Sequence, residues 1–511
     1  MYITGIYHIK EKKNEFLCKG VSIYEDDALC LAAYCPTDAE FSQKFASCYV
    51  EQGDIYNAFD GMFEVAYVDK KTNTFHIFAD ITSFNMDMYY TVYKNCLYYS
   101  NDLKEVLRLS GRKREFHYEV AHAFLQNGFL LGEETLVKDV YKIKIGHELL
   151  VEDGKVEQRR YPIQFKEVSI EDAKETLIST IQDCILAYRK EEGKLCIPLS
   201  RGFDSNMVLH TLRKQDTRII EAFTVGGKRG NNEISSVEQI VAHTKDVNLH
   251  SVTIGSDYAE VLPDIVWRLN GCVYESGIFL DYALSNMAHN FGAKYLITGA
   301  GSDETQFIHY LDNLNAIATG IKNTNTQMYY HSDPYAFANK VYLKKNSVLL
   351  NSFGVDGMYP FKNRKFVEVA HTLENIQKTH KTYYKEEMKK QLPPEVYEVL
   401  KTQGGTTTVG AIYTGDDLLR IKEKLEKTEF LKTLKQHETT MHMPKETYRI
   451  YMEDRLKYMV NRYVLRRTVE KDSDAPLRQL YLYVFYQLFV SGKYDDLFEQ
   501  EGITIKTSDL L

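Results

Sequence analysis

The chain has 511 residues, of which 44% are hydrophobic, so it is expected to bury large cores in two or three domains. Its 71 acidic and 63 basic residues give a formal net charge of −8. This charge excludes the broad positive surface that is typical of proteins that bind nucleic acid or anionic membranes.

The pattern of cysteines and the apolar runs indicate in which cellular compartment the protein is expected. The eight cysteines are scattered without a Cys-x-x-Cys pair, which is typical of reduced thiols and gives no sign of a disulfide framework or a zinc site. No basic and apolar leader opens the chain, and charged residues interrupt every long apolar run. We therefore expect a cytoplasmic protein with no membrane segment.

Residues 1–165 are predicted to form an antiparallel, sheet-rich α+β domain. Short runs of β-branched and aromatic residues alternate with turn signals, as at 63–68, 74–78 and 97–100. Gly146-His147 and Asp153-Gly154 mark further turns between Asp139 and Gln158.

Residues 166–511 are predicted to contain a doubly wound parallel sheet followed by a mostly helical part. Short apolar strands are expected at 195–199, 219–225, 249–254 and 294–298, with helical patterns at 169–189, 233–244 and 280–291. From about residue 305 the pattern is mostly helical. The tyrosine-rich stretch 480–486 is expected to pack in a core or against a partner rather than to line a substrate channel.

The stretch Leu199-Ser-Arg-Gly-Phe-Asp-Ser205 joins a predicted strand to a predicted helix that begins near Ser205. Backbone N–H groups and a helix N-terminus meet there, and such a place attracts phosphate. Ser200 and Ser205 can donate hydroxyl protons, and Asp204 can bind magnesium. The alternative is an ordinary turn in which Asp204 or Ser205 caps the helix.

A second stretch, Thr298-Gly-Ala-Gly-Ser-Asp-Glu304, follows another short strand in the same way. Gly299 and Gly301 allow close approach by a ligand, and Asp303 supplies a carboxylate. In open α/β sheets the ligand lies at the carboxyl ends of the strands, so Asp204 and Asp303 are expected to share one magnesium ion although 99 residues separate them.

At these residues the chain resembles the asparagine synthetase family, and the resemblance runs to about residue 410. The first loop is similar to the family's Ser-Gly-Gly-x-Asp-Ser, and the second to Ser-Gly-Glu-Gly-Ser-Asp-Glu. Further matches follow in order at Phe223-Thr-Val-Gly226, Asn232-Glu233, Val355 to Phe361, Lys381 to Pro394 and Lys401 to Gly404.

The resemblance implies an Ntn-hydrolase-like glutaminase domain at 1–165 and an ATP-pyrophosphatase domain at 166–511. It implies that a substrate carboxylate attacks the α-phosphate of ATP and that an amine then displaces AMP to form an amide. Lys401 corresponds to the family's catalytic lysine; otherwise it is a solvated lysine before a loop. Asp204 and Asp303 correspond to the magnesium ligands, and the ATP-binding positions are Leu199, Ser200, Arg201, Gly202, Asp204, Ser205, Val225, Gly226, Gly299 and Gly301.

The glutaminase features of the family are missing. The family's N-terminal Cys-Gly-Ile aligns with Thr4-Gly5-Ile6, and threonine becomes an N-terminal nucleophile only after removal of three residues. No Asn-Gly-Glu occurs within residues 30–60, and Ala79-Asp80 stands in place of Arg-Asp. The domain is therefore expected to be inactive, and we expect a nitrogen source other than glutamine.

Two departures concern the synthetase part. Ala300 stands where asparagine synthetases carry glutamate and β-lactam synthetases carry a tyrosine that helps deprotonate the amine. Asp356 and Lys401 are then the candidate catalytic residues for that step. Arg201 replaces the first glycine of the loop, and it either contacts pyrophosphate or marks a site where catalysis has decayed.

The favoured function is an amide synthetase that does not use glutamine. Lasso-peptide cyclases, which close a macrolactam within a precursor peptide, lack the glutaminase cysteine and fit best, because holding both groups in one molecule replaces a dedicated base by orientation. The expected ligands are ATP, Mg²⁺ and a substrate that carries a carboxylate and an amine; the expected partners are a precursor peptide with its processing protease and a second copy of the chain. The alternatives are an asparagine synthetase that uses ammonia or glutamine, a β-lactam synthetase-type cyclase, or a scaffold that has lost catalysis.

Overall fold

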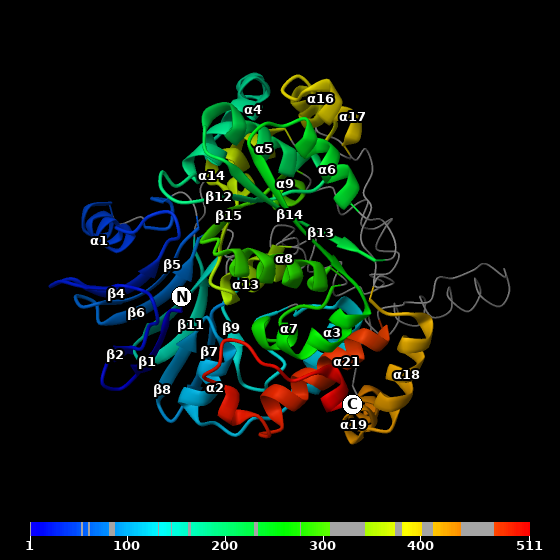
Figure 1. Ribbon diagram of the computed structural model, residues 1–511. Coiled ribbons are helices and arrows are strands. Elements are labelled where there is room, and N and C mark those ends of the chain that lie inside the picture. Colours follow the sequence, from blue (N-terminus) through cyan, green and yellow to red (C-terminus); the bar gives the residue numbers. More distant parts are fainter. Residues whose placement is uncertain are drawn as a thin grey trace.

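A computed structural model describes residues 2–52, 55–59, 62–80, 87–130, 132–144, 146–161, 165–228, 233–275, 277–306, 343–373, 381–400, 412–440 and 475–511. The blue and cyan strands of the N-terminal domain form one side of the molecule, and the green parallel strands and their helices lie beside them (Figure 1). The orange and red C-terminal helices lie below the green part and beside the lower strands of the N-terminal domain (Figure 1).

The N-terminal domain consists of two antiparallel sheets. The first has the order β2-β1-β8-β7-β9, with β1 Thr4–His8, β2 Lys13–Phe16, β7 Tyr89–Tyr93, β8 Cys96–Ser100 and β9 Tyr141–Lys142. The second has the order β11-β10-β6-β5-β4-β3, with β3 Ile23–Glu25, β4 Leu29–Tyr34, β5 Glu64–Asp69, β6 Thr74–Ala79, β10 His147–Glu152 and β11 Lys155–Arg160. The predicted antiparallel domain is confirmed.

Alternation along the strands explains why the two sheets stack. Successive side chains of a strand point to opposite faces, so Ala32 faces the other sheet while Leu31 faces helix α1 (Phe41–Gln52). Between the sheets, the rings of Tyr7 and Phe75 stack with their centroids 4.7 Å apart. The hairpin of β10 and β11 turns at Asp153-Gly154, where both residues have positive φ (49° and 79°), as the sequence predicts.

The second part contains parallel strands in two groups. Strands β12 (Leu195–Pro198), β13 (Ile220–Gly227) and β14 (Val247–Ile254) form one sheet in that order. Strands β15 (Tyr295–Ile297) and β16 (Asp356–Met358) form another, and β15 lies beside β12. The parallel strands are confirmed, and β16 is a short strand within the part of the chain that is otherwise mostly helical, as expected after residue 305.

Helices cover both faces of these strands, as a doubly wound fold requires. Ile197 and Ile297 point into a core with α4 (Ile170–Ala187), α5 (Phe203–Gln215) and α14 (Arg364–Thr372), whereas Cys196 and Leu296 point into a second core with α8 (Ile278–Phe291) and α13 (Lys344–Ser352). The remaining elements are α6 (Ile234–Ala242), η1 (Ser256–Val261), α9 (Ser302–Gln306), η3 (Pro360–Lys362), α16 (Thr382–Lys389) and α17 (Pro394–Val399).

The largest core joins the two ends of the chain. Helices α2 (Leu103–Ser110) and α3 (Tyr118–Asn127) pack there with α7 (Leu262–Arg268), α18 (Gly415–Glu426), α19 (Glu429–Thr440) and α21 (Ala475–Phe485). The short helices η6 (Tyr486–Val490), η7 (Asp495–Leu497) and α22 (Thr507–Leu510) complete this region.

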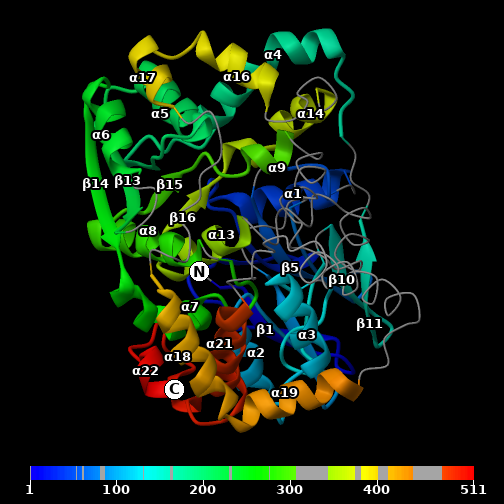
Figure 2. The same cartoon turned by 90° about the vertical axis from the view of Figure 1, so that its right-hand side faces the viewer.

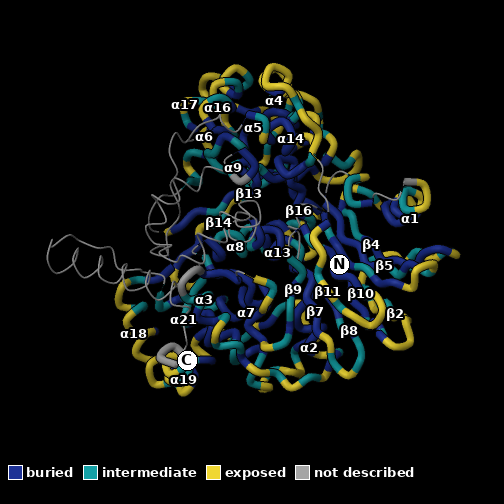
Figure 3. The backbone as a smooth tube through the Cα atoms, turned by 180° about the vertical axis from the view of Figure 1, so that it is seen from behind, coloured by how far each residue is buried: buried dark blue, intermediate teal, exposed yellow. Residues whose placement is uncertain are grey.

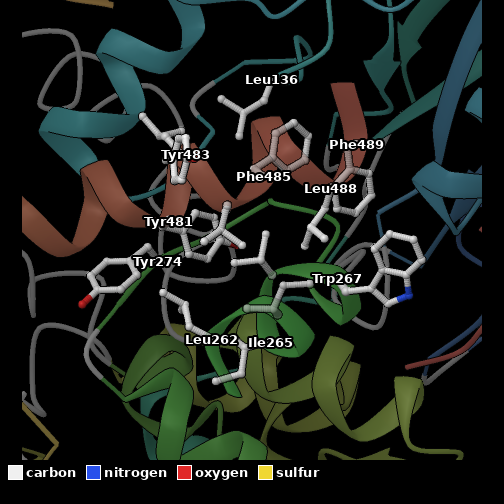
Figure 4. Packing of buried hydrophobic residues seen from close by; sticks show 14 of the residues in the cluster. Leu136, Leu262, Ile265, Trp267, Tyr274, Tyr481, Tyr483, Phe485, Leu488 and Phe489 are labelled. Atoms are coloured by element: carbon white, nitrogen blue, oxygen red, sulfur yellow. The ribbon is translucent and has the colours of Figure 1, made fainter. Parts of the chain in front are cut away.

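The C-terminal residues are part of this core rather than an appendage. Figure 4 shows Tyr481, Phe485 and Phe489 packed over Leu262 and Trp267, and the rings of Trp267 and Phe489 have centroids 5.3 Å apart. The tube in Figure 3 is buried along the central strands and exposed mainly on outer turns. The expected packing role of the tyrosine-rich stretch is confirmed.

Three general expectations can be compared with the structure. All eight cysteines are free thiols. None of the helices in the described part of the chain has the length and apolar character needed to cross a bilayer. The described ranges also hold no group of three or more histidine, cysteine, aspartate or glutamate residues that could bind a metal ion by itself.

Candidate active site

The loop between β12 and α5 is held in shape by its own side chains. The N–H of Gly202 donates to Oγ of Ser200 (3.1 Å), and Oγ of Ser205 donates to the carbonyl oxygens of Ser200 (3.1 Å) and Gly202 (3.2 Å). The side-chain amide of Asn206 donates to the same two carbonyl oxygens at 3.0 and 2.9 Å. These bonds satisfy the loop carbonyls, which fixes the loop without a ligand.

Helix α5 begins earlier than predicted, at Phe203, and Gly202 is its N-cap. The alternative in which Asp204 or Ser205 caps the helix is therefore wrong, because both residues lie within the first turn of α5 and the N-cap is a glycine without a side chain. The N-cap Gly202 makes no side-chain capping bond to α5. Helix N-termini of this kind offer backbone N–H groups to which phosphate can bind.

The second loop lies against the first. A Cβ atom on Gly299 would lie 2.6 Å from the backbone nitrogen of Ser205 and 2.7 Å from the carbonyl carbon of Asp204. Only glycine permits this approach, so Gly299 serves the contact between the two loops, whereas the sequence suggested a contact with ligand. Gly301 has a φ of +93°, a conformation that favours glycine.

The two predicted magnesium ligands meet at one lysine. The ammonium nitrogen of Lys381 lies 2.6 Å from Oδ2 of Asp204 and 2.6 Å from Oδ1 of Asp303. It also donates to Oγ of Ser302 (3.0 Å), whose hydroxyl donates to Oδ1 of Asp204 (2.7 Å). Gln306 donates to the same Ser302 oxygen at 2.7 Å. The two aspartates are thus brought together as predicted, with a lysine between them.

Helix α16 positions this lysine. Lys381 precedes α16 with a φ of 54°, and its side chain is only 4% exposed. Figure 2 shows α16 and α5 at the same end of the molecule, and the two helices are in contact. The resemblance placed Lys381 in a matching segment, but nothing in the sequence marked it as a site residue.

Burial and charge set the protonation of the cluster. Burial raises the pKa of the Asp204 carboxyl, the Lys381 ammonium opposes this shift, and the Asp303 carboxylate adds to it. Burial lowers the pKa of Lys381, but the carboxylates of Asp204 and Asp303 outweigh that effect and raise it to about 12. Lys381 is therefore an ammonium ion at neutral pH and holds the two acidic side chains together.

The donor set fits a magnesium ion. The carboxylates of Asp204 and Asp303 converge on one point, and the hydroxyl of Ser302 reaches the same point. Magnesium prefers hard oxygen ligands and is commonly held by one or two carboxylates together with substrate phosphates. Two carboxylates near the N-terminus of α5 are ligands of that kind.

The remaining predicted ATP positions lie around the same sheet edge. The N–H of Leu199 donates to the carbonyl of Phe223 (2.8 Å), which places Leu199 beside Val225 and Gly226 near the carboxyl end of β13. Nε of Arg201 lies 3.8 Å from Oε1 of Glu233, next to the start of α6. The side chain of Arg201 thus extends from the loop between β12 and α5 toward Glu233.

One predicted catalytic residue, Asp356, is not with this cluster. Asp356 is the first residue of β16 and pairs with Tyr295, so it lies at the opposite end of the strand from Gly299. The hydroxyl of Tyr34 donates to its carboxylate, and Lys190 Nζ is 4.0 Å away. This position argues against Asp356 as the base. Lys401 lies outside the described residues.

Alanine at position 300 contributes no polar side-chain group, and its side chain packs against a hydrophobic core. Its N–H donates to the hydroxyl of Thr298 (3.0 Å), which shapes the loop before Gly301. The methyl side chain can neither accept a proton nor bind an amine. Any base for the amine therefore comes from another residue or from the substrate.

In the N-terminal domain, the residue aligned with the glutaminase cysteine is built into a strand. Thr4 is the first residue of β1 and is buried, and its hydroxyl shares a hydrogen bond with Ser100 (2.7 Å). The N–H of Ile3 donates to Asn101 (2.7 Å), and Tyr2 pairs with Lys19. Release of Thr4 as a terminus would remove the contacts made by Tyr2 and Ile3.

Comparison with known domain families gives two matches. The family model described as asparagine synthase matches residues 177–310, which include both loops of the site. The model described as glutamine amidotransferase domain matches residues 37–162 and begins after the Thr4 position.

Curated relatives match over part of their length. Asparagine synthetase [glutamine-hydrolyzing] 1 of Bacillus subtilis is 23% identical over 224 residues, and amidase chry2 of Gibberella zeae is 26% identical over 241 residues. Each alignment covers 42% of this chain and 35% of the relative. The chain therefore spans about a third of the length of the curated relatives it matches.

Solved structures resemble the chain weakly. The allosteric regulatory enzyme of purine biosynthesis gives a TM-score of 0.20 at 8% identity, over 47% of this chain and 63% of that one. Glutamine phosphoribosylpyrophosphate amidotransferase from B. subtilis gives 0.17 at 6% identity, over 46% of this chain and 64% of that one.

Proposed function

The chain belongs to the asparagine synthetase family, and from that premise we propose that it is an ATP-dependent ligase that forms an amide by adenylating a carboxylate. The observation that carries this proposal is the convergence of Asp204, Asp303 and Lys381 beside the N-terminus of α5. Two carboxylates for a metal and a helix end for phosphate, at the carboxyl ends of parallel strands, suit a metal-bound nucleotide.

The reaction proceeds in two steps. An oxygen of the substrate carboxylate bonds to the α-phosphorus of ATP, and pyrophosphate leaves with the electron pair of the broken bond. The amine then bonds to the acyl carbon, AMP leaves, and the amine loses a proton. Magnesium held by Asp204 and Asp303 would neutralise phosphate charge.

The predicted ATP-binding residues form two groups, one for each end of the ATP molecule. Ser200, Gly202, Ser205 and the N-terminus of α5 bind the pyrophosphate end, with Arg201 at the mouth of the loop. Leu199, Val225 and Gly226 take the nucleoside end at the sheet edge. Gly299 and Gly301 let the second loop pack closely beside this end. Lys401 stabilises charge that develops during the reaction.

The nitrogen comes from an amine other than glutamine-derived ammonia. Thr4 in place of the glutaminase nucleophile and Ala300 in place of glutamate or tyrosine support this part. An amine on the same substrate molecule needs no base beyond correct orientation, which favours closure of a macrolactam in a precursor peptide supplied by a processing protease.

A second candidate is an ammonia-dependent asparagine synthetase. The similarity to the Bacillus asparagine synthetase supports it, whereas Ala300 argues against it. The two candidates differ in the product: free asparagine in one case, and a cyclic peptide that has lost one water molecule in the other.

The test is product analysis with purified protein, Mg²⁺, ATP labelled at the α-phosphate, and a panel of peptides or aspartate with ammonia. AMP and pyrophosphate in equal amounts support adenylation, and ADP would refute it. Asp303→Asn should abolish pyrophosphate release, while Asp257→Asn, which changes an exposed aspartate elsewhere, should not. Absence of both products across the panel would favour the scaffold alternative.

A further inference from the structure

Lys385 is a second lysine beside the phosphate loop. Its N–H donates to the carbonyl oxygen of Lys381 (2.9 Å), so it follows Lys381 by one helical turn. Side chains four residues apart lie on the same side of a helix. Nζ of Lys385 lies 5.3 Å from the ring centroid of Phe203, the first residue of α5. The ammonium is thus placed over the N-terminus of α5, next to Asp204.

This ammonium differs from that of Lys381 in having no polar partner. Lys381 is bound by two carboxylates and a hydroxyl. Within the described ranges, Lys385 makes no hydrogen bond or ion pair through its ammonium, although its side chain is half-buried. Contact with an aromatic ring offsets only part of the lost hydration. The ammonium of Lys385 can therefore bind an anion near the N-terminus of α5 without breaking a hydrogen bond or ion pair.

The charges around Lys385 agree with this position. Burial and the neighbouring Lys381 lower the pKa of Lys385, and Asp303 and Asp204 act in the opposite direction. The ammonium of Lys385 thus interacts electrostatically with Lys381, Asp303 and Asp204, the three charged groups of the site. An arriving anion would relieve the repulsion from Lys381 and compensate the burial.

We propose that Lys385 binds the pyrophosphate end of ATP and holds it as the leaving group. The inference rests on the proposed function, in which pyrophosphate leaves with the electron pair of its bond to the α-phosphorus. Magnesium at the two aspartates would compensate their charge, so the phosphate oxygens need further cations. Lys385 supplies one without giving up an existing bond, and no proton is transferred.

The experiment measures binding rather than turnover. Isothermal titration determines the affinities of Mg-pyrophosphate, Mg-ATP and AMP for the wild type, Lys385→Gln, Lys385→Arg and Lys389→Gln. Lys389 is a matched control one turn further along α16; it is exposed and also lies over a ring, that of Tyr397, at 4.9 Å.

Loss of one charge-assisted contact should weaken pyrophosphate and ATP binding about 10-fold in Lys385→Gln. AMP lacks the pyrophosphate end and should bind the variant as it binds the wild type. Lys385→Arg keeps the charge, so its affinities for pyrophosphate and ATP should stay within about 3-fold of the wild-type values. Lys389→Gln should have the same affinities as the wild type. Melting without nucleotide checks that each variant is folded.

Several outcomes would overturn the assignment. Equal pyrophosphate affinity in Lys385→Gln and the wild type would remove Lys385 from the site while leaving the proposed function intact. An equal loss for AMP would mean a general defect or contact with the α-phosphate, and either contradicts the assignment. A wild type that binds none of the three ligands would overturn both this inference and the proposed function.

Discussion

The ammonium nitrogen of Lys381 lies 2.6 Å from a carboxylate oxygen of Asp204, although 177 residues separate the two in the chain. The same nitrogen is 2.6 Å from Asp303. Lys381 therefore stands at the point on which two magnesium-type ligands converge. A metal ion can occupy that point only if the ammonium moves away, and phosphate oxygens are its natural next partners.

Lys381→Met should increase the affinity of the nucleotide-free protein for Mn²⁺, because the ammonium no longer competes with the metal between the two carboxylates. Electron paramagnetic resonance of free Mn²⁺ measures this binding. In metal-free buffer the variant should lose about 3 kcal/mol of stability, since a buried charge pair is broken. Unchanged or weaker Mn²⁺ binding would show that Lys381 does not hold the metal position.

Gly299→Ala should destabilise the protein by about 2 kcal/mol, because the added Cβ meets the backbone of Asp204 and Ser205 at 2.6–2.7 Å. Separation of the two loops should also impair pyrophosphate release. Gly415→Ala is the matched control: a Cβ there meets nothing within 4 Å at the start of α18. Chemical denaturation of both variants provides the measurement, and equal stabilities would contradict the close contact.

Arg201→Gly should weaken ATP binding about 10-fold if the guanidinium replaces a loop amide as a phosphate contact. The side chain has a polar neighbour in Glu233, but at 3.8 Å this is a loose pair that a phosphate can displace. Arg201→Lys serves as the charge-conserving control. If Arg201→Gly consumed ATP faster than the wild type, Arg201 would instead mark a site where catalysis has decayed.

Acid should destabilise the protein partly through His210 on α5. Burial is the main reason that its pKa is lowered to about 4, whereas an unfolded histidine titrates near 6.5. Between these values the unfolded state binds more protons, so stability falls as the pH decreases from about 6.5 to 4, by at most about 3 kcal/mol. His210→Gln should flatten this dependence.

The control for that measurement is His243→Gln, which changes an exposed histidine just after α6. Denaturant unfolding at several pH values compares the three proteins. If His210→Gln lost stability with acid as steeply as the wild type, the buried neutral imidazole would not be the cause.

Much of the fold follows from local patterns in the sequence. The short apolar strand at 195–199 and the turn at Asp153-Gly154 are short-range features, and both are found where the residues predict them. Strand β16 was missed because its sequence, Asp-Gly-Met, is not an apolar run, whereas the equally short β15 is Tyr-Leu-Ile. Its pairing partner, β15, lies about 60 residues earlier in the chain.

The site was predicted only in part for a similar reason. Asp204 and Asp303 each follow an apolar strand, which sequence can show. Lys381 reaches them through the position of α16, which depends on packing against α4 and α5. Asp356 was misplaced because a motif gives no information on which end of a strand its acidic residue occupies.

The largest core has a consequence for synthesis of the chain. It needs Leu103 and Val106 from one end and Leu480 to Phe489 from the other, with more than 370 residues between them. At translation rates of about 5–20 residues per second, the apolar face of α2 waits on the order of tens of seconds for its partner. Premature termination before residue 480 would leave that face exposed and make the fragment a target for chaperones or aggregation.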